Sequence, residues 1–304
     1  MQKNILKSGI EISEIGLGCM SLGTNYAQAE PIIERAIEHG ITYFDTADIY
    51  DKGINEEIVG QALKKYQNRD DIVIGTKVGN HLADDGSTFW DPSKKYIKTA
   101  VKSSLQRLGL NHLDLYQLHG GTIDDPLDET ISAFDDLKKE GVIRAYGISS
   151  IRPNVIDYYL EHSEIETLMS QLNLIDNRPE ALLNAIHAKN VKVLARGPVF
   201  KGLLTANSNH ALDSKFRDGV FEYSNQELGE TIASVKEVES NLTGLTFKYL
   251  TSKDPIGSII VGASSIEQLD ENINNYEASK EISFEILKAA RGRVKNLEYT
   301  QHLK

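Results

Sequence analysis

The sequence is poor in cysteine, since Cys19 is the only one among its 304 residues. A single thiol cannot form an internal disulfide, and it excludes a cysteine-rich metal site. Long apolar runs are lacking as well, because none approaches the ~20 residues that span a bilayer. The N-terminal stretch MQKNILKSGIEIS has no apolar core of the kind that a signal peptide carries. These absences predict a cytoplasmic protein in a reducing compartment, with no membrane partner.

Positive charge is scarce too. The chain carries 33 Lys and Arg against 44 Asp and Glu, for a formal net charge of −11, and it has no basic run or stripe. This balance argues against binding to a nucleic-acid backbone, although local basic residues could hold a small anionic ligand. No Pro/Gly/Ser-rich linker divides the sequence. We therefore expect one domain over residues 1–304, long enough to bury a substantial core.

Short apolar runs alternate with longer segments of helical period. The apolar runs predict strands at 15–20, 41–46, 71–77, 113–119, 143–149, 167–173, 191–196 and 257–263. The periodic segments predict helices near 31–40, 54–66, 93–108, 127–139, 152–161, 178–189, 226–250 and 265–275. Continuous apolar runs are typical of parallel strands covered by helices. Eight strand–helix units most simply close into a (β/α)8 barrel of the α/β class. A doubly wound open sheet is the alternative, but no G-x-G-x-x-G follows the first strand.

The first and last helices have their own signals. Pro31 suits the N1 position of the first helix, and Gly40 supplies its C-terminal stop. The stretch 287–304 predicts a basic amphipathic terminal helix that packs on the barrel.

Four polar side chains come at or just after neighbouring strand ends. Asp45 ends the second strand and Tyr50 lies in the loop after it, while Lys77 and His119 close the third and fourth strands. In such barrels the chemistry sits at this end. A tyrosine with a pKa of about 10 is a poor proton donor unless a nearby ammonium stabilises the phenolate. The set therefore predicts proton transfer to an oxygen that gains negative charge, as in carbonyl reduction.

Alternatives to this chemistry stay open for the same residues. Each one alone could be structural, such as a cap for Asp45 or packing for Tyr50, and the functional hypothesis rests on all four meeting at one rim. Asp45, Asp48 and His119 could form a metal set, but the adjacent lysine opposes a cation, so no metal is expected. A two-carboxylate glycosidase would need a second acid on another strand end, and none stands there.

At these residues the sequence resembles the aldo-keto reductase family. FDTADIY and NEEIVGQAL resemble its FDTA-x-x-Y signature and E-x-x-x-G helix, and IGTKVG and LDLYQLH resemble the lysine and histidine segments. GVIRAYGISS and VGASSIEQLDENI match two later segments, so the likeness runs in order over residues 4–276. NILKSGIEISEIGLG looks like the hairpin that plugs the bottom of the family's barrel.

The resemblance implies reduction of aldehydes or ketones with NAD(P)H, without a metal. Tyr50 would be the general acid, Lys77 would lower its pKa, Asp45 would anchor Lys77, and His119 would orient the carbonyl. Two further hypotheses stay open. One is a non-catalytic nicotinamide-nucleotide-binding subunit that senses redox state. The other is a lyase on the same barrel, which would turn over without nicotinamide.

The cofactor positions match the family less evenly. Ser150 stands where asparagine is common, Met169 stands where a glutamine would align so that Gln171 takes that role, and Arg196 replaces a stacking aromatic residue. The cofactor contacts implied by the resemblance are Gly18, Cys19, Met20, Ser149, Ser150, Gln171, Arg196, Gly197, Pro198, Gly202, Leu203, Gly262, Ser264, Gln268 and Asn272.

Two residues bear on cofactor preference and on the substrate. Gln268 stands where many NADPH-selective members have arginine, so the usual charge contact with a 2′-phosphate is weakened. The resemblance still implies NADPH, which the family usually prefers, and NADH stays open as the alternative. Trp90, the only tryptophan, is the candidate substrate contact, with loop packing as the alternative.

Overall fold

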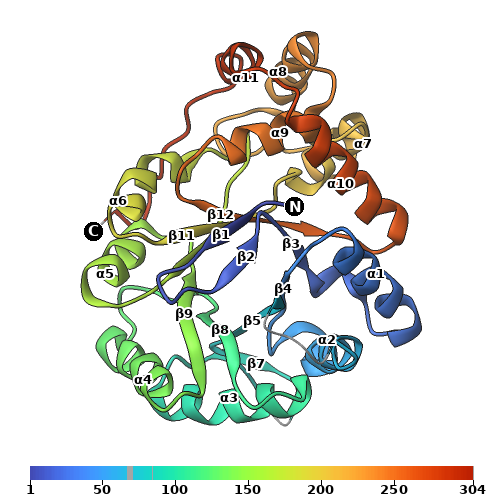
Figure 1. Cartoon of the computed structure of the whole chain (residues 1–304). Helices are drawn as coiled ribbons and strands as arrows, with labels where there is room; N and C mark the ends of the chain where they lie inside the picture. Colours follow the sequence, from blue (N-terminus) through green and yellow to red (C-terminus); the bar gives the residue numbers. More distant parts are fainter. Residues whose placement is uncertain (67–70, 84, 304) are drawn as a thin grey trace.

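Eight parallel strands close into a barrel in a computed structural model that describes residues 1–66, 71–83 and 85–303 (Figure 1). The strands follow one another around the barrel, and the last pairs with the first. In order they are β3 (Ile15–Gly18), β4 (Tyr43–Asp45), β5 (Val73–Val78), β8 (Leu113–Leu118), β9 (Ile143–Ser149), β10 (Thr167–Gln171), β11 (Lys192–Arg196) and β12 (Ile256–Gly262). The predicted (β/α)8 barrel and all eight predicted strands are confirmed.

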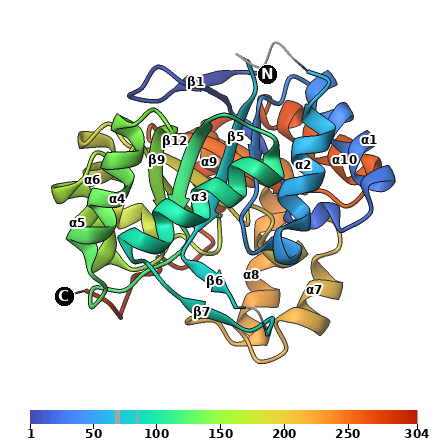
Figure 2. The same cartoon turned by 90° about the horizontal axis from the view of Figure 1, so that it is seen from below.

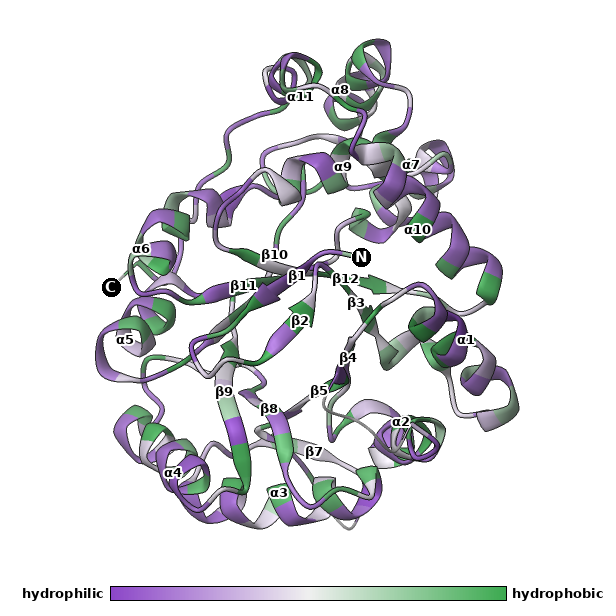
Figure 3. Ribbon diagram, viewed as in Figure 1, coloured by the Kyte–Doolittle hydropathy of each residue, from purple (hydrophilic) through white to green (hydrophobic). Residues whose placement is uncertain are grey.

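Helices surround the barrel, with their hydrophobic faces toward the strands and hydrophilic faces outward (Figure 3). They are α1 (Tyr26–Glu38), α2 (Ile54–Leu63), α3 (Lys94–Leu108), α4 (Leu127–Lys139), α5 (Pro153–His162), α6 (Leu183–Ala188), α7 (Ser208–Lys215), α8 (Asn225–Val238), α9 (Leu242–Thr251), α10 (Ile266–Ser279) and α11 (Phe284–Arg291). Among the described residues, no helix is both long enough and apolar enough to cross a membrane.

Capping side chains set several helix starts, and one of them corrects a prediction. Pro31 does not begin the first helix but lies inside α1. The helix starts earlier because the Asn25 side chain accepts a hydrogen bond from the Ala27 N–H at 3.0 Å, which satisfies one of the free donors of the first turn. The predicted stop is confirmed, since Gly40 follows the helix with φ of +80°, a conformation that favours glycine.

Two other helix predictions were wrong in extent. The segment 226–250 forms α8 and α9, and the break at Glu239–Asn241 arises because Glu239 is extended and the Asn241 side chain caps α9 at the Gly244 N–H. The helix predicted over 287–304 ends at Arg291. Beyond Arg291 the chain continues without a helix. Asn177 fixes this segment, because its Nδ2 donates to the Lys295 carbonyl and its Oδ1 accepts from the Leu297 N–H.

The N-terminal end of the barrel is closed by the predicted hairpin, β1 (Lys3–Ile5) and β2 (Glu11–Ser13). Leu6, Ile10 and Ile12 of this hairpin pack with inward-facing barrel residues in one buried cluster. Figure 2 shows β1 at one end of the molecule and α7, α8 and a second hairpin at the other. That second hairpin is β6 (Asn80–Leu82) with β7 (Thr88–Trp90). The hairpin that closes the bottom therefore leaves the opposite end for function.

Close packing of α2 on α3 generates a stability prediction. A β-carbon added at Gly60 would overlap the Leu108 carbonyl group. We expect Gly60→Ala to lower the free energy of unfolding by about 1–3 kcal/mol, because overpacking outweighs the better helix propensity of alanine. The control is Gly229→Ala in α8, where the nearest atom would lie 3.7 Å away and stability should rise by about 0.5–1 kcal/mol. Denaturant unfolding measures both, and equal effects of the two substitutions would contradict the prediction.

Candidate active site

Strand alternation brings Asp45 and Lys77 together inside the barrel. Both lie at the carboxyl ends of neighbouring strands, β4 and β5, and point inward. The Lys77 side chain is fully buried, and its Nζ lies 2.6 Å from Asp45 Oδ2 and donates to the Thr46 carbonyl at 2.6 Å. The same Nζ lies 3.4 Å from the Tyr50 hydroxyl. The ammonium therefore bridges the carboxylate and the phenol.

A left-handed turn holds Tyr50 over this pair. Asp51, Lys52 and Gly53 follow it with φ of 48°, 57° and 93°, a conformation that is strained for the two residues with side chains. The Tyr50 N–H donates to the Ala47 carbonyl at 3.2 Å. The turn reverses the chain directly after Tyr50, so the phenol reaches back over the strand ends.

Two further side chains hold Asp45, and the sequence analysis missed both. The Tyr43 hydroxyl donates to Asp45 Oδ1 at 3.2 Å, and Gln117 Nε2 lies 3.5 Å from the same oxygen. Tyr43 could have been found from the alternation of a strand, because it precedes Asp45 by two residues and so shares its face. Asp45 therefore has polar partners on both carboxylate oxygens.

Burial and charge act against each other on these pKa values. Burial lowers the pKa of Lys77, but the charges and hydrogen bonds of Asp45 and Tyr50 outweigh it, so that the pKa is raised. Burial raises the pKa of Asp45, and Lys77 opposes that shift. Burial also raises the pKa of Tyr50, with Lys77 again acting in the opposite direction. In this structure the ammonium limits, without reversing, the effect of burial on the phenol.

His119 stands edge-on to Tyr50, with ring centroids 5.8 Å apart and an interplanar angle of 80°. Its Nδ1 is buried and has no hydrogen-bond partner within the described part of the chain. Burial, together with the charges of Lys77 and Arg196, lowers the pKa of the imidazole to about 3. The ring is therefore neutral at physiological pH and can offer one donor and one acceptor.

A cavity of about 600 Å³ opens over these residues. The predicted site residues that line it are Asp45, Tyr50, His119, Gly18, Met20, Ser149, Ser150, Gln171, Arg196, Gly197 and Gly262. Sequence reasoning missed Arg152 and Lys201, which add two cations to its wall. Lys201 could have been suspected from its place beside the predicted Gly202, and Arg152 from its place after Ser149 and Ser150.

The remaining predicted residues lie around the cavity rather than in its lining. Cys19 and Leu203 are buried, and Lys77 lies beneath the phenol. Pro198 and Gly202 belong to the loop after β11, where Gly202 has φ of 89°. The Trp90 Nε1 donates to Asp125 Oδ2 at 2.9 Å, so the indole is tied to the loop after β8.

Four predicted cofactor residues lie together where β12 ends and α10 begins. Gln268 Oε1 accepts hydrogen bonds from the Ser264 N–H at 2.9 Å and from its hydroxyl at 3.0 Å. Asn272 Nδ2 donates to the Gly262 carbonyl at 3.2 Å. These contacts hold together the loop between β12 and α10, at a helix N-terminus of the kind that suits a phosphate.

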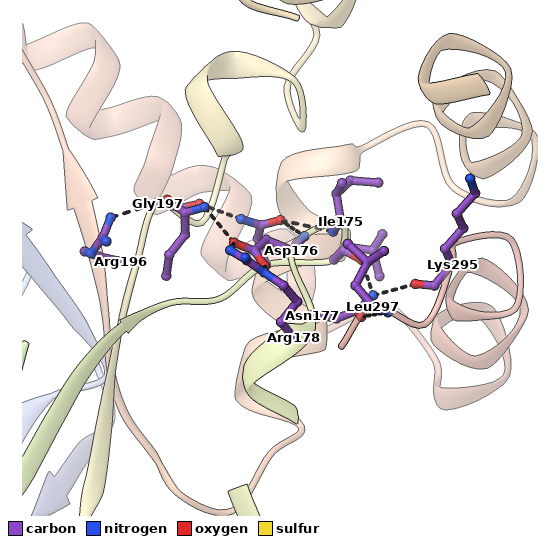
Figure 4. Close-up of polar contacts among 11 residues, drawn as sticks. Ile175, Asp176, Asn177, Arg178, Arg196, Gly197, Lys295 and Leu297 are labelled. Carbon is purple, nitrogen blue, oxygen red and sulfur yellow. Dashed lines mark hydrogen bonds and ion pairs between the residues drawn. The ribbon is translucent and has the colours of Figure 1, made fainter. Parts of the chain in front are cut away.

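A polar network that includes Asp176, Arg178 and Arg196 (Figure 4) fixes the orientation of Gln171. Gln171 Nε2 donates to Asp176 Oδ2 at 2.7 Å, and Arg196 Nη1 donates to Gln171 Oε1 at 3.3 Å. Arg178 Nε donates to the other Asp176 oxygen at 2.7 Å. Because Asp176 can only accept from the amide nitrogen, the Gln171 oxygen is turned toward Arg196 and the cavity.

Comparison with known proteins identifies relatives over nearly the whole chain. The model of the Aldo/keto reductase family matches residues 14–289. The chain is 50% identical over 300 residues to "Uncharacterized oxidoreductase YqkF" of Bacillus subtilis, covering 97% of each chain. It is 28% identical to the "NADH-specific methylglyoxal reductase" of Escherichia coli, covering 87% of this chain and 90% of that one. The holo form of the aldo-keto reductase AKR11C1 from Bacillus halodurans superposes with a TM-score of 0.93 at 45% identity, covering 100% of both chains.

The low pKa of His119 predicts a pH dependence of stability. The folded ring titrates near 3 and the unfolded ring near the ordinary value of about 6.5. Between pH 7 and 5 the His119 ring therefore takes up a proton in the unfolded chain but not in the folded chain. The free energy of unfolding falls by about 1–2 kcal/mol as a result. His119→Asn should remove this part of the slope, whereas His162→Asn on the outer helix α5 should keep it. Identical slopes for wild type and His119→Asn in urea unfolding at each pH would contradict the assignment.

Proposed function

Since the chain belongs to the aldo/keto reductase family, whose members carry out NAD(P)H-dependent carbonyl reduction, we propose that it reduces aldehydes or ketones to alcohols with NADPH and with Tyr50 as general acid. The observation that carries the proposal is the contact of the Lys77 ammonium with both Tyr50, at 3.4 Å, and Asp45, at 2.6 Å. A buried ammonium beside a phenol that faces a cavity suits proton donation to a substrate oxygen.

The proposed proton transfer uses three side chains. When bound, a nicotinamide cofactor supplies the hydride to the carbonyl carbon. Tyr50 gives its proton to the carbonyl oxygen, which becomes the hydroxyl of the alcohol. Lys77 stabilises the phenolate that remains, because an opposite charge at this distance favours the ionised form. Asp45 keeps the ammonium in place and balances its charge inside the barrel.

His119 has a separate role in the proposal. Its neutral ring lines the same cavity as Tyr50, so it can donate a hydrogen bond to the carbonyl oxygen without competing for the proton. A positive imidazolium at this place would add a third cation beside Lys77 and Arg196. Burial and these two charges disfavour it and so lower the pKa of the ring. The ring therefore orients the substrate, and Tyr50 alone supplies the proton.

The lining of the cavity fits a nicotinamide nucleotide. Ser149, Ser150 and Gln171 provide the polar groups that a carboxamide needs, and the network at Asp176 presents the Gln171 oxygen as an acceptor. Arg152, Arg196 and Lys201 add positive charge for phosphate groups. A β-carbon at Gly262 would lie 2.9 Å from the Ser21 hydroxyl. A side chain at this edge of the cavity would require the exposed Ser21 hydroxyl to move.

The preference for NADPH rests on the family's habit and on this positive lining. Gln268 brings no charge to the start of α10, and one relative is named as NADH-specific, so NADH is the competing cofactor. The alternative function, a non-catalytic nucleotide-binding subunit that senses redox state, would bind NADPH tightly and turn over no carbonyl. Incubation with NADPH and a panel of activated aldehydes such as 4-nitrobenzaldehyde separates the two.

Replacement of Tyr50 by phenylalanine, which removes only the phenol oxygen, tests the role of Tyr50 as general acid. We expect Tyr50→Phe to lower kcat by at least about 10²-fold, because positioned proton donation contributes roughly 10²–10⁴, while NADPH affinity stays nearly unchanged. Tyr158→Phe, which removes a hydroxyl that contacts Asp128 on the outside of the barrel, is the matched control and should keep full activity. Steady-state rates and fluorescence titration with NADPH provide the two readouts. Retained turnover in Tyr50→Phe would assign the proton to another group.

Cofactor preference is tested by binding rather than turnover. We expect the dissociation constant for NADPH to be lower than that for NADH when both are titrated by intrinsic fluorescence. A tenfold tighter binding of NADH, about 1.4 kcal/mol in favour of the dinucleotide without the 2′-phosphate, would overturn the preference and leave the assignment of Tyr50 untouched.

A further inference from the structure

A second cavity, of about 490 Å³, is lined in part by the loop that carries Tyr50. Its lining residues come from that loop, from β6, from residues 91–93 and from α3. It shares no lining residue with the cavity over the catalytic set. Its volume falls in the range of about 300–1,000 Å³ that is usual for small-molecule sites. The proposed reaction leaves this cavity without a role.

One wall of the second cavity is aromatic. His81 and Tyr96 are stacked, with ring centroids 4.1 Å apart and an interplanar angle of 15°. The Phe89 ring contacts His81 from outside the lining, with ring centroids 4.5 Å apart. Leu82 and Ala100 add apolar surface to the lining. Stacked rings of this kind offer a flat face or edge to a planar group.

The charged groups around the cavity are mostly positive. Lys52 and Lys95 line it as exposed side chains, and neither forms an ion pair with any residue that the structure describes. Arg107 also lines it, held in place by buried Glu56 through Nε–Oε2 at 2.6 Å. The carboxylate of Asp91 is engaged by the His81 ring at 3.4 Å and by the Ser93 N–H at 3.1 Å. The uncommitted charges are therefore ammonium groups.

The lining of the cavity includes a carboxyl group with one unpartnered oxygen. Asp48 Oδ1 is buried and has no hydrogen-bond partner within residues 1–66, 71–83 and 85–303. Burial, together with Glu56, raises the pKa of Asp48 to about 8, against the opposing effect of Arg107. The raised pKa favours the protonated form at neutral pH, and this form does not repel an anion. The Asp48 N–H donates to the Lys77 carbonyl at 3.2 Å, so this part of the lining is fastened to the strand that carries the catalytic lysine.

We propose that this cavity is a second binding site, which takes a small organic anion with a planar unsaturated part, such as an aromatic carboxylate. The ring of the ligand packs against the wall of His81 and Tyr96. Its carboxylate faces Lys52 and Lys95 at the rim. The site does not depend on the cofactor or on turnover, and it lies against the loop that positions Tyr50.

Binding of 4-fluorobenzoate to the full chain, followed by ¹⁹F NMR titration, tests the site. We expect saturable binding, which Ser103→Trp abolishes because the new indole on exposed Ser103 fills the cavity that this residue lines. Lys95→Gln should weaken binding about two- to fivefold, the size of one exposed charge contact. Lys102→Gln makes the same charge change on the same helix, at an exposed position outside the lining, and should have no effect. Thermal melts confirm that each variant is folded.

Two further measurements locate the bound ligand and define its chemistry. Backbone amide shifts in ¹H–¹⁵N spectra should gather at Leu82, Tyr96 and Ala100, and neutral 4-fluorobenzamide should bind more weakly than the carboxylate. Shifts confined to Ser149 and Gln171 would place the ligand in the catalytic cavity and overturn the proposal. Absence of saturable binding, unchanged binding by folded Ser103→Trp, or equal losses in Lys95→Gln and Lys102→Gln would overturn it as well.

Discussion

The ion pair between Lys77 and Asp45 is the interaction on which the arrangement at the carboxyl ends of the barrel strands depends. An isolated ammonium in the barrel interior would cost several kcal/mol, and a close carboxylate with further hydrogen bonds is what makes such burial tolerable. Thr46, Tyr43 and Gln117 supply those hydrogen bonds from three positions around the pair. In the proposed reaction, the chemistry of Tyr50 thus depends on groups outside the lining of its cavity.

The geometry of a closed parallel barrel explains why these groups meet. Side chains two residues apart on a strand share a face, so Tyr43 and Asp45 fill successive layers of the interior. The lower layers are apolar and continue into the hairpin β1–β2, which leaves polar residues to the strand ends. Loops after those ends then supply the groups that need a precise but irregular placement. Strands hold the charges, while the loop brings Tyr50, the proposed proton donor, to them.

Features that follow from the periodicity of the sequence could be predicted. Features that depend on a single local contact, such as a helix cap, could not. All eight strands could be predicted, because buried parallel strands read as continuous apolar runs. The start of α1 could not, since the Asn25 cap competes with the proline signal at Pro31, and the break near Asn241 interrupts an unbroken helical pattern. At the site, motif order pointed to Tyr50 and Lys77. Arg152 and Lys201 were not predicted, because they stand in loops, where no periodic pattern indicates which way a side chain points.

The strained turn after Tyr50 also requires support from outside the cavity that Tyr50 lines. Glu56, fully buried, accepts a hydrogen bond from the Thr76 hydroxyl at 2.5 Å, directly beside Lys77, and pairs with Arg107. Arg107 in turn packs so closely on Gly53 that a β-carbon there would lie 2.8 Å from its Cδ. The left-handed turn is thus clamped between β5 and α3, and backbone strain persists only where its surroundings over-determine it. Because Arg107 also lines the second cavity, the clamp that positions the phenol forms one wall of a space open to other ligands.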